Sequence, residues 1–206
     1  MSGTHAAVVL AAGGSRRLGR PKQLLTRDGE TLVRRAVRLA AETSPARLLV
    51  VVGAFRARIE EALTGVACEP VFNPEWESGL ASSLRAAAAA LAGHAGAVLI
   101  VGCDQPALTS EHLLRLLAGA ATADSGCAAT SHEGCPGIPA VVTATMLQDA
   151  RMSDGDRGLG ARMRKLPAND VSMLDSPELG FDIDDEAGLR AAVEQGLIDP
   201  PDPRFP

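Results

Sequence analysis

The sequence predicts an α/β fold, a three-layer sandwich in which helices cover both faces of a mostly parallel sheet. First, short apolar runs alternate with stretches of helical spacing along the 206-residue chain. Second, these runs are apolar throughout, which is typical of strands covered on both faces. Third, 46% of the residues are hydrophobic, which is enough for a sizeable core. Strands and helices that alternate in this way form a largely parallel sheet.

The apolar runs are the expected strands, and the stretches of helical spacing are the expected helices. Leu32, Val33, Ala36 and Val37, for example, share one helical face. The strands are expected at residues 6–11, 47–53, 66–72, 97–102, 126–130, 138–142 and 180–183. The helices are expected at residues 30–42, 55–63, 78–92, 109–120, 158–165 and 185–195. We expect a single domain over residues 1–198 and a flexible Pro-rich tail over residues 199–206.

Composition and charge exclude several classes of function. The net charge is −5 and the pI is about 5.4, whereas nucleic-acid-binding domains are usually basic. No apolar run approaches the roughly 20 residues that span a membrane, and no Lys or Arg precedes the first strand, as a signal peptide would require. The four cysteines form no CxxC pair and match no zinc spacing. We therefore expect a cytoplasmic protein with free thiols that binds neither nucleic acid nor membrane.

The loop that follows the first strand, Leu10–Lys22, is the first candidate site. Ligands of parallel sheets bind where loops leave the carboxyl ends of the strands. Gly13 and Gly14 allow a tight turn whose N–H groups can cradle phosphate oxygens. Five basic residues accompany this turn in an acidic chain: Arg16, Arg17, Arg20, Lys22 and Arg27. The loop matches neither GxxxxGK[ST] nor GxGxxG, and a solvated basic loop is the alternative interpretation.

The same loop resembles the signature loop of the MobA-like NTP transferases, and most closely that of the molybdenum cofactor cytidylyltransferases. The matching positions are Leu10, Ala11, Ala12, Gly13, Ser15, Arg17, Leu18, Gly19 and Lys22. The resemblance extends over about residues 8–189 and implies a Rossmann-like nucleotidyltransferase fold of the GT-A type. It implies that residues 10–15, Gly14 included, together with Arg17 and Lys22, bind a nucleoside triphosphate. Arg17 and Lys22 would be catalytic, because they would stabilise charge on the departing pyrophosphate.

The second candidate site is the segment Cys103–Pro106, directly after the expected strand at residues 97–102. Asp104 lies at the same edge of the sheet as the first loop. A carboxylate there is either a turn or cap residue or a ligand of Mg²⁺, which takes one or two protein carboxylates plus phosphate oxygens. The segment resembles the GD-x-P element of the family, with Cys103 inserted so that it reads CDQP. The resemblance implies that Asp104 is the primary Mg²⁺ ligand and a catalytic residue.

A second pair of acids lies in the segment Phe181–Asp185. Alternation puts Asp182 and Asp184 on one face of the expected strand, although capping of the following helix is the competing explanation. The segment resembles the D-I-D-T-P-E-D-L element of the family, but Asp185 and Glu186 replace the Thr and Pro. We expect Asp184 to be the second Mg²⁺ ligand, with Asp182 as the alternate.

Three further segments resemble the family. The segment 73–84 matches N-P-x-[WY]-x-x-G-x-x-x-S-[LV], which implies nucleotide contacts from Asn73, Gly79, Ser82 and Ser83. The two serines could instead start a helix, and Trp76 could stack on a planar group or simply anchor the packing. In the G-H-P element the His is replaced by Ile138. The segment 156–158 resembles a stretch near the second substrate, or it is a Gly-rich loop before a helix.

These resemblances imply a Mg²⁺-dependent transfer of a nucleoside monophosphate, CMP from CTP, to the phosphate of molybdopterin with release of pyrophosphate. GTP is the alternative nucleotide, because the cytidylyl assignment depends on the small residue Ala12. A different phosphorylated acceptor is a second alternative. The non-enzymatic alternative is a regulatory domain that binds a nucleotide without turnover. A molybdoenzyme or its chaperone is the expected protein partner.

Overall fold

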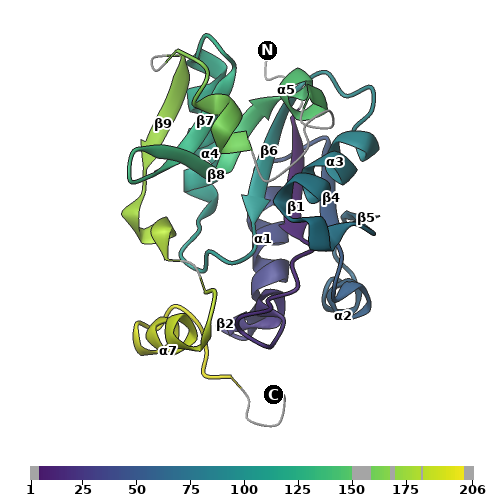
Figure 1. The fold of residues 1–206 in the computed structure, drawn as a ribbon, viewed down its shortest axis with the longest axis vertical. Coiled ribbons are helices and arrows are strands. Elements are labelled where there is room, and N and C mark those ends of the chain that lie inside the picture. The colour runs from purple at the N-terminus through teal and green to yellow at the C-terminus, as the bar shows by residue number, and fades with distance from the viewer. Residues whose placement is uncertain (1–4, 150–158, 168–169, 182, 202–206) are drawn as a thin grey trace.

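The computed structural model describes residues 5–149, 159–167, 170–181 and 183–201. Within them, a seven-stranded sheet runs in the order β5-β4-β1-β6-β8-β7-β9 (Figure 1). Strand β8 is antiparallel to both neighbours, and the other neighbouring pairs are parallel. The sheet is therefore mostly parallel, as expected. The strands are β1 (Ala6–Ala11), β4 (Arg47–Val52), β5 (Glu69–Phe72), β6 (Ala97–Gly102), β7 (Cys127–His132), β8 (Cys135–Thr143) and β9 (Val171–Asp175).

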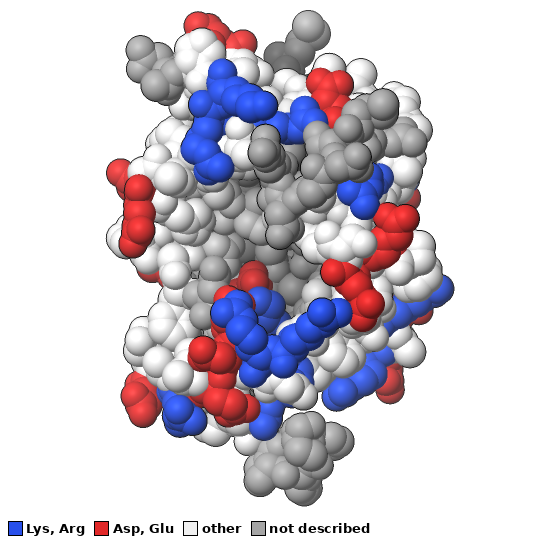
Figure 2. All heavy atoms as spheres, in the orientation of Figure 1, with Lys and Arg blue, Asp and Glu red and all other residues white. Residues whose placement is uncertain are grey.

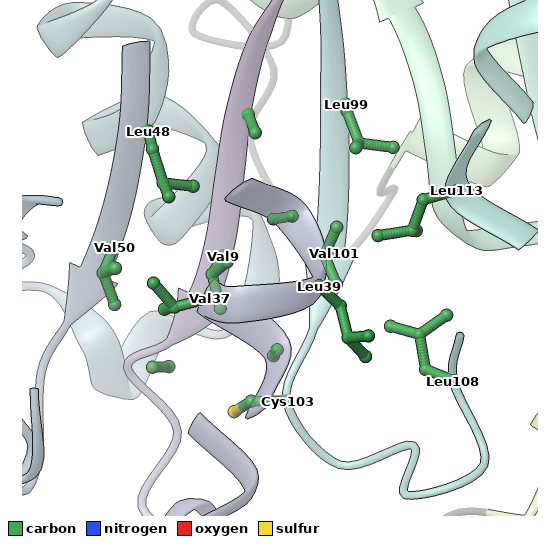
Figure 3. Packing of buried hydrophobic residues seen from close by; sticks show 14 of the residues in the cluster. Val9, Val37, Leu39, Leu48, Val50, Leu99, Val101, Cys103, Leu108 and Leu113 are labelled. Atoms are coloured by element: carbon green, nitrogen blue, oxygen red, sulfur yellow. The ribbon is translucent and has the colours of Figure 1, made fainter. Parts of the chain in front are cut away.

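Helices cover both faces of the sheet, which confirms the three-layer sandwich. The cluster on one face includes Val9, Val50 and Val101 from the strands and Val37 and Leu113 from two helices (Figure 3). This face is covered by α1 (Leu32–Ala41), α2 (Arg56–Ala62) and α4 (Ser110–Thr122). The opposite face is covered by α3 (Leu80–Ala90), α5 (Ala144–Asp149) and α6 (Leu159–Met163). Successive strand residues point to opposite faces, so β1, β4 and β6 each contribute to both clusters.

Local capping sets where three of the helices begin. The side chain of Thr31 accepts a hydrogen bond from the backbone of Arg34 at the start of α1, and Thr109 caps α4 in the same way. Asp185 caps α7 (Glu186–Glu194) by accepting from Gly188 N. Such caps satisfy N–H groups that have no partner within the helix. The cap of α7 is therefore Asp185, and the side chain of Asp184 is available for other contacts.

Helix α7 packs against the N-terminal loop rather than against the sheet, and it lies beside the hairpin of β2 (Thr26–Arg27) and β3 (Glu30–Thr31) in Figure 1. A separate apolar cluster joins Leu18 and Leu25 of the loop region to Ile183 and Leu189. Asp199, the first residue of the expected tail, accepts hydrogen bonds from the backbone N–H groups of Asp28 and Gly29. The end of the described chain is thus tied to the segment that follows the basic loop.

Some sequence-based expectations about the elements are wrong. The strand expected at residues 180–183 is not formed by its described residues; a 3₁₀ helix, Pro177–Gly180, takes up its start. The side chain of Ile183 packs with α7 instead of joining the sheet. Strand β9 was not predicted because it is not a continuous apolar run, and α5 was not predicted because its six residues are too few to show helical spacing. The helix expected from residue 30 begins at Leu32, since Glu30 and Thr31 pair with β2.

The described part of the chain contains no helix that is both long enough and apolar enough to cross a membrane. All four cysteines are free.

Candidate active site

The basic loop after β1 is held in a defined turn. Ser15 lies at φ 47°, its carbonyl accepts from the N–H groups of Leu18 and Gly19, and its Oγ accepts from Lys22 N at 3.1 Å. The side chain of Gln23 is 1% exposed and donates to Gly13 O at 2.7 Å. These bonds shape the backbone that the sequence predicts as a phosphate cradle. Sequence reasoning missed Gln23, because the carbonyls to which it donates lie ten and twelve positions earlier in the chain.

Trp76 packs directly on this loop. A Cβ added at Gly14 would lie 2.6 Å from Cζ3 of Trp76, and one added at Gly53 would lie 2.6 Å from the Cβ of Trp76. The guanidinium of Arg16 lies over the indole ring, 5.7 Å from its centroid, and also pairs with Glu77 at 2.9 Å. The two glycines therefore let the backbone approach the ring, and Trp76 acts as a packing anchor of the loop.

Lys22 joins both predicted metal-binding carboxylates. Its Nζ lies 2.7 Å from Oδ2 of Asp104 and 3.1 Å from Oδ1 of Asp184. Arg17 donates to the other oxygen of Asp184. Since β1 and β6 are adjacent and parallel, their carboxyl ends deliver Lys22 and Asp104 to one edge of the sheet, while the packing of α7 returns Asp184 to it. The structure thus brings together Arg17, Lys22, Asp104 and Asp184.

Charge balance dominates the electrostatics of this cluster. Burial alone would lower the pKa of Lys22, but Asp104 and Asp184 outweigh burial and raise that pKa above its ordinary value. Burial would raise the pKa of Asp184, but Lys22 and Arg17 outweigh it and lower that pKa. At neutral pH Lys22 is therefore an ammonium and Asp184 a carboxylate. In Figure 2, one group of Lys and Arg side chains in the lower half of the displayed face has Asp and Glu side chains beside it, and another group lies near the top.

The two carboxylates fit a magnesium ion that is completed by phosphate oxygens. The side chains of Asp104 and Asp184 are 26% and 42% exposed, so both are accessible to a ligand. Within the described ranges no group of three or more His, Cys, Asp or Glu side chains could hold a metal on its own. Mg²⁺ commonly takes one or two protein carboxylates and several substrate or water oxygens. The ammonium between the two acids shows that this position favours a cation. Asp182, the alternate ligand, lies outside the described residues.

The predicted nucleotide contacts at residues 73–83 form an internal network. Asn73 is 2% exposed, and its Nδ2 donates to Ser82 Oγ at 2.8 Å and to Ser83 Oγ at 3.1 Å. Ser82 Oγ in turn donates to the carbonyl of Gly79, which has φ 88° at the start of α3. These bonds hold the turn between β5 and α3. Contact of these four residues with a nucleotide stays a prediction.

Gln105 connects the Asp104 loop to two other segments. Its Nε2 donates to the carbonyls of Ile138 and Leu179, at 3.1 and 3.0 Å, and the side chain is buried. Leu179 belongs to the 3₁₀ helix that leads to Asp184. Gln105 therefore sets the position of β8 and of the second carboxylate segment relative to Asp104. Sequence reasoning did not single it out, because its partners are backbone carbonyls far along the chain.

A pocket of about 1060 Å³ opens beside Asp104 and Gln105. The ends of β7 and β9 contribute to its lining, and Ile138, which replaces the His of the family, forms part of its wall. Residues 156–158, which the sequence associates with a second substrate, lie outside the described residues. The pocket is the candidate location for that substrate, because it adjoins the carboxylate that faces the basic loop.

One family model and several known proteins match the sequence of this chain. The model of the MobA-like NTP transferase domain matches residues 7–171. Nicotine blue oxidoreductase of Paenarthrobacter nicotinovorans is 33% identical over 172 residues, which cover 78% of this chain and 81% of that protein. The bifunctional protein GlmU of Jannaschia sp. (strain CCS1) is 35% identical over 111 residues, 52% of this chain and 24% of the relative. The chain thus spans about a quarter of the length of the GlmU proteins that it matches.

Solved structures share the fold. A nucleotidyl transferase from Methanothermobacter thermautotroptrophicus superposes with a TM-score of 0.77 at 24% identity, covering 94% of this chain and 98% of that one. Rv0371c from Mycobacterium tuberculosis H37Rv, in complex with manganese, superposes with a TM-score of 0.74 at 22% identity, covering 93% of this chain and 98% of that one. The family match extends over most of the described sheet and includes both Lys22 and Asp104. The chain therefore belongs to the MobA-like NTP transferase family of nucleotidyltransferases.

Proposed function

We propose that this protein transfers CMP from CTP to the phosphate of a molybdopterin-type acceptor in the cytoplasm. An oxygen of the acceptor phosphate attacks the α-phosphorus, the bond from that phosphorus to the bridging oxygen breaks, and pyrophosphate leaves. The observation that carries the proposal is the position of Lys22 between Asp104 and Asp184, at the carboxyl ends of two parallel strands. A basic loop and two acids at one sheet edge suit a metal-bound triphosphate.

The chain does not need a strong general base for this reaction. A phosphate monoester has a second pKa of about 6, so the nucleophile is already ionised near neutral pH. What remains is to position the reactants and to balance charge. In the structure, Lys22 and Arg17 pair with the carboxylates of Asp104 and Asp184. In the reaction, the two basic side chains would bind pyrophosphate oxygens in place of these carboxylates. The turn at Ser15 would direct backbone N–H groups to the same phosphates.

Asp104 and Asp184 are the residues that would hold magnesium. The bound ion would supply positive charge to the α-phosphate and to the leaving group. Manganese in the complex of Rv0371c supports the use of a divalent cation by this fold. The donor set of the present chain, two accessible carboxylates, suits either ion when phosphate oxygens complete the coordination.

The proposal of CTP depends on Ala12, which gives the loop the Leu-Ala-Ala-Gly sequence that resembles the cytidylyl branch of the family. Ala12 is buried, its carbonyl accepts from Ala54 N, and a Cβ at Gly53 would lie 2.9 Å from the Cβ of Ala12. This part of the loop is tightly packed, and a methyl group at position 12, where the guanylyl branch usually has Gly, is the feature that favours the smaller pyrimidine in the proposal. GTP is the alternative nucleotide, and a molybdoenzyme or its chaperone is the partner that would receive the product.

The test is pyrophosphate release with each of CTP, GTP, ATP and UTP, with Mg²⁺ or Mn²⁺, in the presence and absence of molybdopterin. We expect release only with CTP, metal and molybdopterin together. Asp104→Ala should abolish it while circular dichroism and the melting temperature show a folded protein. If GTP is the one nucleotide that supports pyrophosphate release, with metal and molybdopterin present, the protein is a guanylyltransferase and not a cytidylyltransferase. Binding of CTP without any release would indicate a regulatory domain.

A further inference from the structure

The guanidinium of Arg27, one of the five basic residues of the first candidate site, bonds to the loop that carries Asp104. Its Nη1 donates to the carbonyl of Pro106 at 2.6 Å, and the side chain is 27% exposed. Proline has no N–H group, so this carbonyl is the one backbone group of Pro106 that can form a hydrogen bond. Hydrogen bonds from a charged donor are shorter and stronger than neutral ones. Arg27 therefore holds the chain two positions after the carboxylate that is proposed as the primary metal ligand.

The two proposed metal ligands are supported by different parts of the chain. Asp104 follows β6 of the central sheet. Asp184 lies next to Ile183, which is buried in an apolar cluster that includes Leu25. Arg27 lies two positions after Leu25 in the hairpin of β2 and β3, and its side chain bonds to the Asp104 loop. Arg27 thus connects the support of one carboxylate to the support of the other.

Asp199 fixes the hairpin that carries Arg27. The turn residues Asp28 and Gly29 have φ values of 53° and 77°, as a tight two-residue hairpin turn requires. The N–H of Asp28 donates to Oδ1 of Asp199 at 3.0 Å, and that of Gly29 donates to Oδ2 at 2.9 Å. The N–H of Asp199 donates to the carbonyl of Thr26 at 2.7 Å. The bond from Gly29 lowers the pKa of Asp199, so both carboxylate oxygens accept at neutral pH.

The bond from Arg27 does not depend on the ammonium that now joins the two acids. In the proposed reaction Lys22 binds pyrophosphate oxygens and no longer bridges Asp104 and Asp184. The bond of Arg27 uses the backbone carbonyl of Pro106, so this exchange leaves it in place. Mg²⁺ demands a near-ideal arrangement of its ligands, and groups that orient metal ligands typically contribute about 10–100-fold to metal affinity. The spacing of the two carboxylates therefore needs a support of this kind.

We propose that Arg27 and Asp199 are positioning residues of the metal site. Asp199 fixes the hairpin, and Arg27 then holds the Asp104 loop at the distance from Asp184 that one shared divalent cation requires. The segment that ends at Asp199 is thus part of the scaffold of the site. The proposal rests on the proposed function, because it concerns the metal of that reaction.

The probe is Mn²⁺ alone, and its binding is measured by electron paramagnetic resonance in the Lys22→Met background. That background removes the ammonium between the two acids, so metal binding is measured without a nucleotide. Addition of Arg27→Met should weaken Mn²⁺ binding about tenfold. Arg27→Lys keeps a donor and should recover part of this loss. Arg34→Met is the matched control, because Arg34 Nη1 also donates to a backbone carbonyl, that of Ala62 at the end of α2. It should leave Mn²⁺ binding unchanged.

The contribution of Asp199 is tested in the same background. Asp199→Ala loses both acceptors and should also weaken Mn²⁺ binding. Asp199→Asn retains one acceptor oxygen, so its effect should be smaller. Denaturant titration gives the free energy of unfolding of each variant. A purely structural role would lower that free energy and leave the Mn²⁺ dissociation constant unchanged, which would contradict the proposal.

A second measurement uses the protein with Lys22 intact. There Arg27→Met should raise the Mg²⁺ concentration that gives half-maximal pyrophosphate release, while KM for CTP changes little. Equal Mn²⁺ dissociation constants with and without Arg27→Met, or no Mn²⁺ binding by the Lys22→Met protein, would overturn the proposal. If Arg27→Met does not fold, Arg27→Lys and Asp199→Asn provide the same comparison.

The two measurements separate this proposal from the proposed function. Weaker Mn²⁺ binding in the variants, together with no pyrophosphate release from any nucleotide, would support the positioning roles and contradict the transfer reaction. Pyrophosphate release from CTP and molybdopterin, together with unchanged Mn²⁺ binding in the variants, would support the transfer reaction and contradict the positioning roles.

Discussion

The ammonium of Lys22 lies 2.7 Å from Oδ2 of Asp104, and it joins the loop that follows β1 to the loop that follows β6. The same nitrogen also contacts Asp184, which is 162 positions away in the chain. One side chain therefore connects three segments that meet only in the folded protein. The two carboxylates keep the ammonium in place, and the ammonium keeps two like charges from facing each other unbalanced.

Replacement of Lys22 by alanine should impair catalysis strongly. The variant loses a positive charge aimed at the departing pyrophosphate, and removal of one such donor typically costs roughly 3–4 kcal/mol, or at least a hundredfold in rate. Pyrophosphate release under saturating substrate is the measurement. The control is Lys165→Ala, since Lys165 is the other lysine of the chain and is exposed. A loss of less than tenfold, about 1.4 kcal/mol, would contradict a catalytic role of Lys22.

The contribution of Asp184 to stability should depend on pH. Burial would raise its pKa, but Lys22 and Arg17 lower it below the ordinary value of 3.8. A carboxyl group whose pKa is lower in the folded than in the unfolded state stabilises the fold at pH values above its unfolded-state pKa. This contribution is lost as the pH falls through the folded-state pKa. The difference in unfolding free energy between the wild type and Asp184→Asn should therefore be full at neutral pH and shrink below about pH 4.

Denaturant titrations of the two proteins over a series of pH values measure this difference. The control introduces Asp184→Asn into a protein that already carries Arg17→Met and Lys22→Met. There the pH-dependent difference should be lost, because the two cations that lower the pKa are gone. A difference that is the same at acidic and neutral pH in the wild-type background would show that these cations do not stabilise the carboxylate.

Replacement of Gln105 by methionine should reduce both stability and turnover. The variant leaves the carbonyls of Ile138 and Leu179 without their donor, and an unsatisfied buried group costs about 1–3 kcal/mol. Because Gln105 aligns the Asp104 loop with the segment leading to Asp184, we expect kcat to fall while KM for the nucleotide changes little. Chemical denaturation and steady-state kinetics measure the two effects.

Gln148→Met is the matched control for this prediction. Gln148 of α5 donates to the carbonyl of Ala88 in α3, on the face of the sheet away from α1 and α4. Its replacement should lower the free energy of unfolding but leave kcat unchanged. If both variants lower stability and neither changes kcat, Gln105 is a structural residue only.

A methyl group at Gly14 should destabilise the loop by overpacking. The added Cβ would lie 2.6 Å from Trp76 in Gly14→Ala, and overpacked sites typically lose about 1–3 kcal/mol. Gly180→Ala is the control, since no described atom lies within 4 Å of a Cβ at that position. It should change stability by less than about 0.5 kcal/mol. Equal melting temperatures for the two variants would mean that Trp76 moves away without cost.

Much of the sheet could be predicted from sequence because its strands are continuous apolar runs. The bounds expected for β1 and β6 match the structure, and the loop that follows each strand was recognised from its glycines, basic residues and acid. Helix α1 was also predicted, although the expected helix started two residues too early, because its apolar positions repeat with helical spacing. Strand β9 escaped prediction because Ser172 interrupts its apolar residues and Asp175 ends them.

The sequence by itself determined the three-layer fold, the basic loop and the carboxylate Asp104, because local patterns of burial and turn formation carry that information. Only the tertiary structure decided which groups meet. Asp184 reaches Lys22 because α7 packs on Leu18 and Leu25, not because a strand presents it as the alternation suggested. The bonds of Gln105 and the Arg27–Pro106 pair likewise join distant segments. Such contacts depend on how separate elements pack together, and no local pattern in the sequence encodes them.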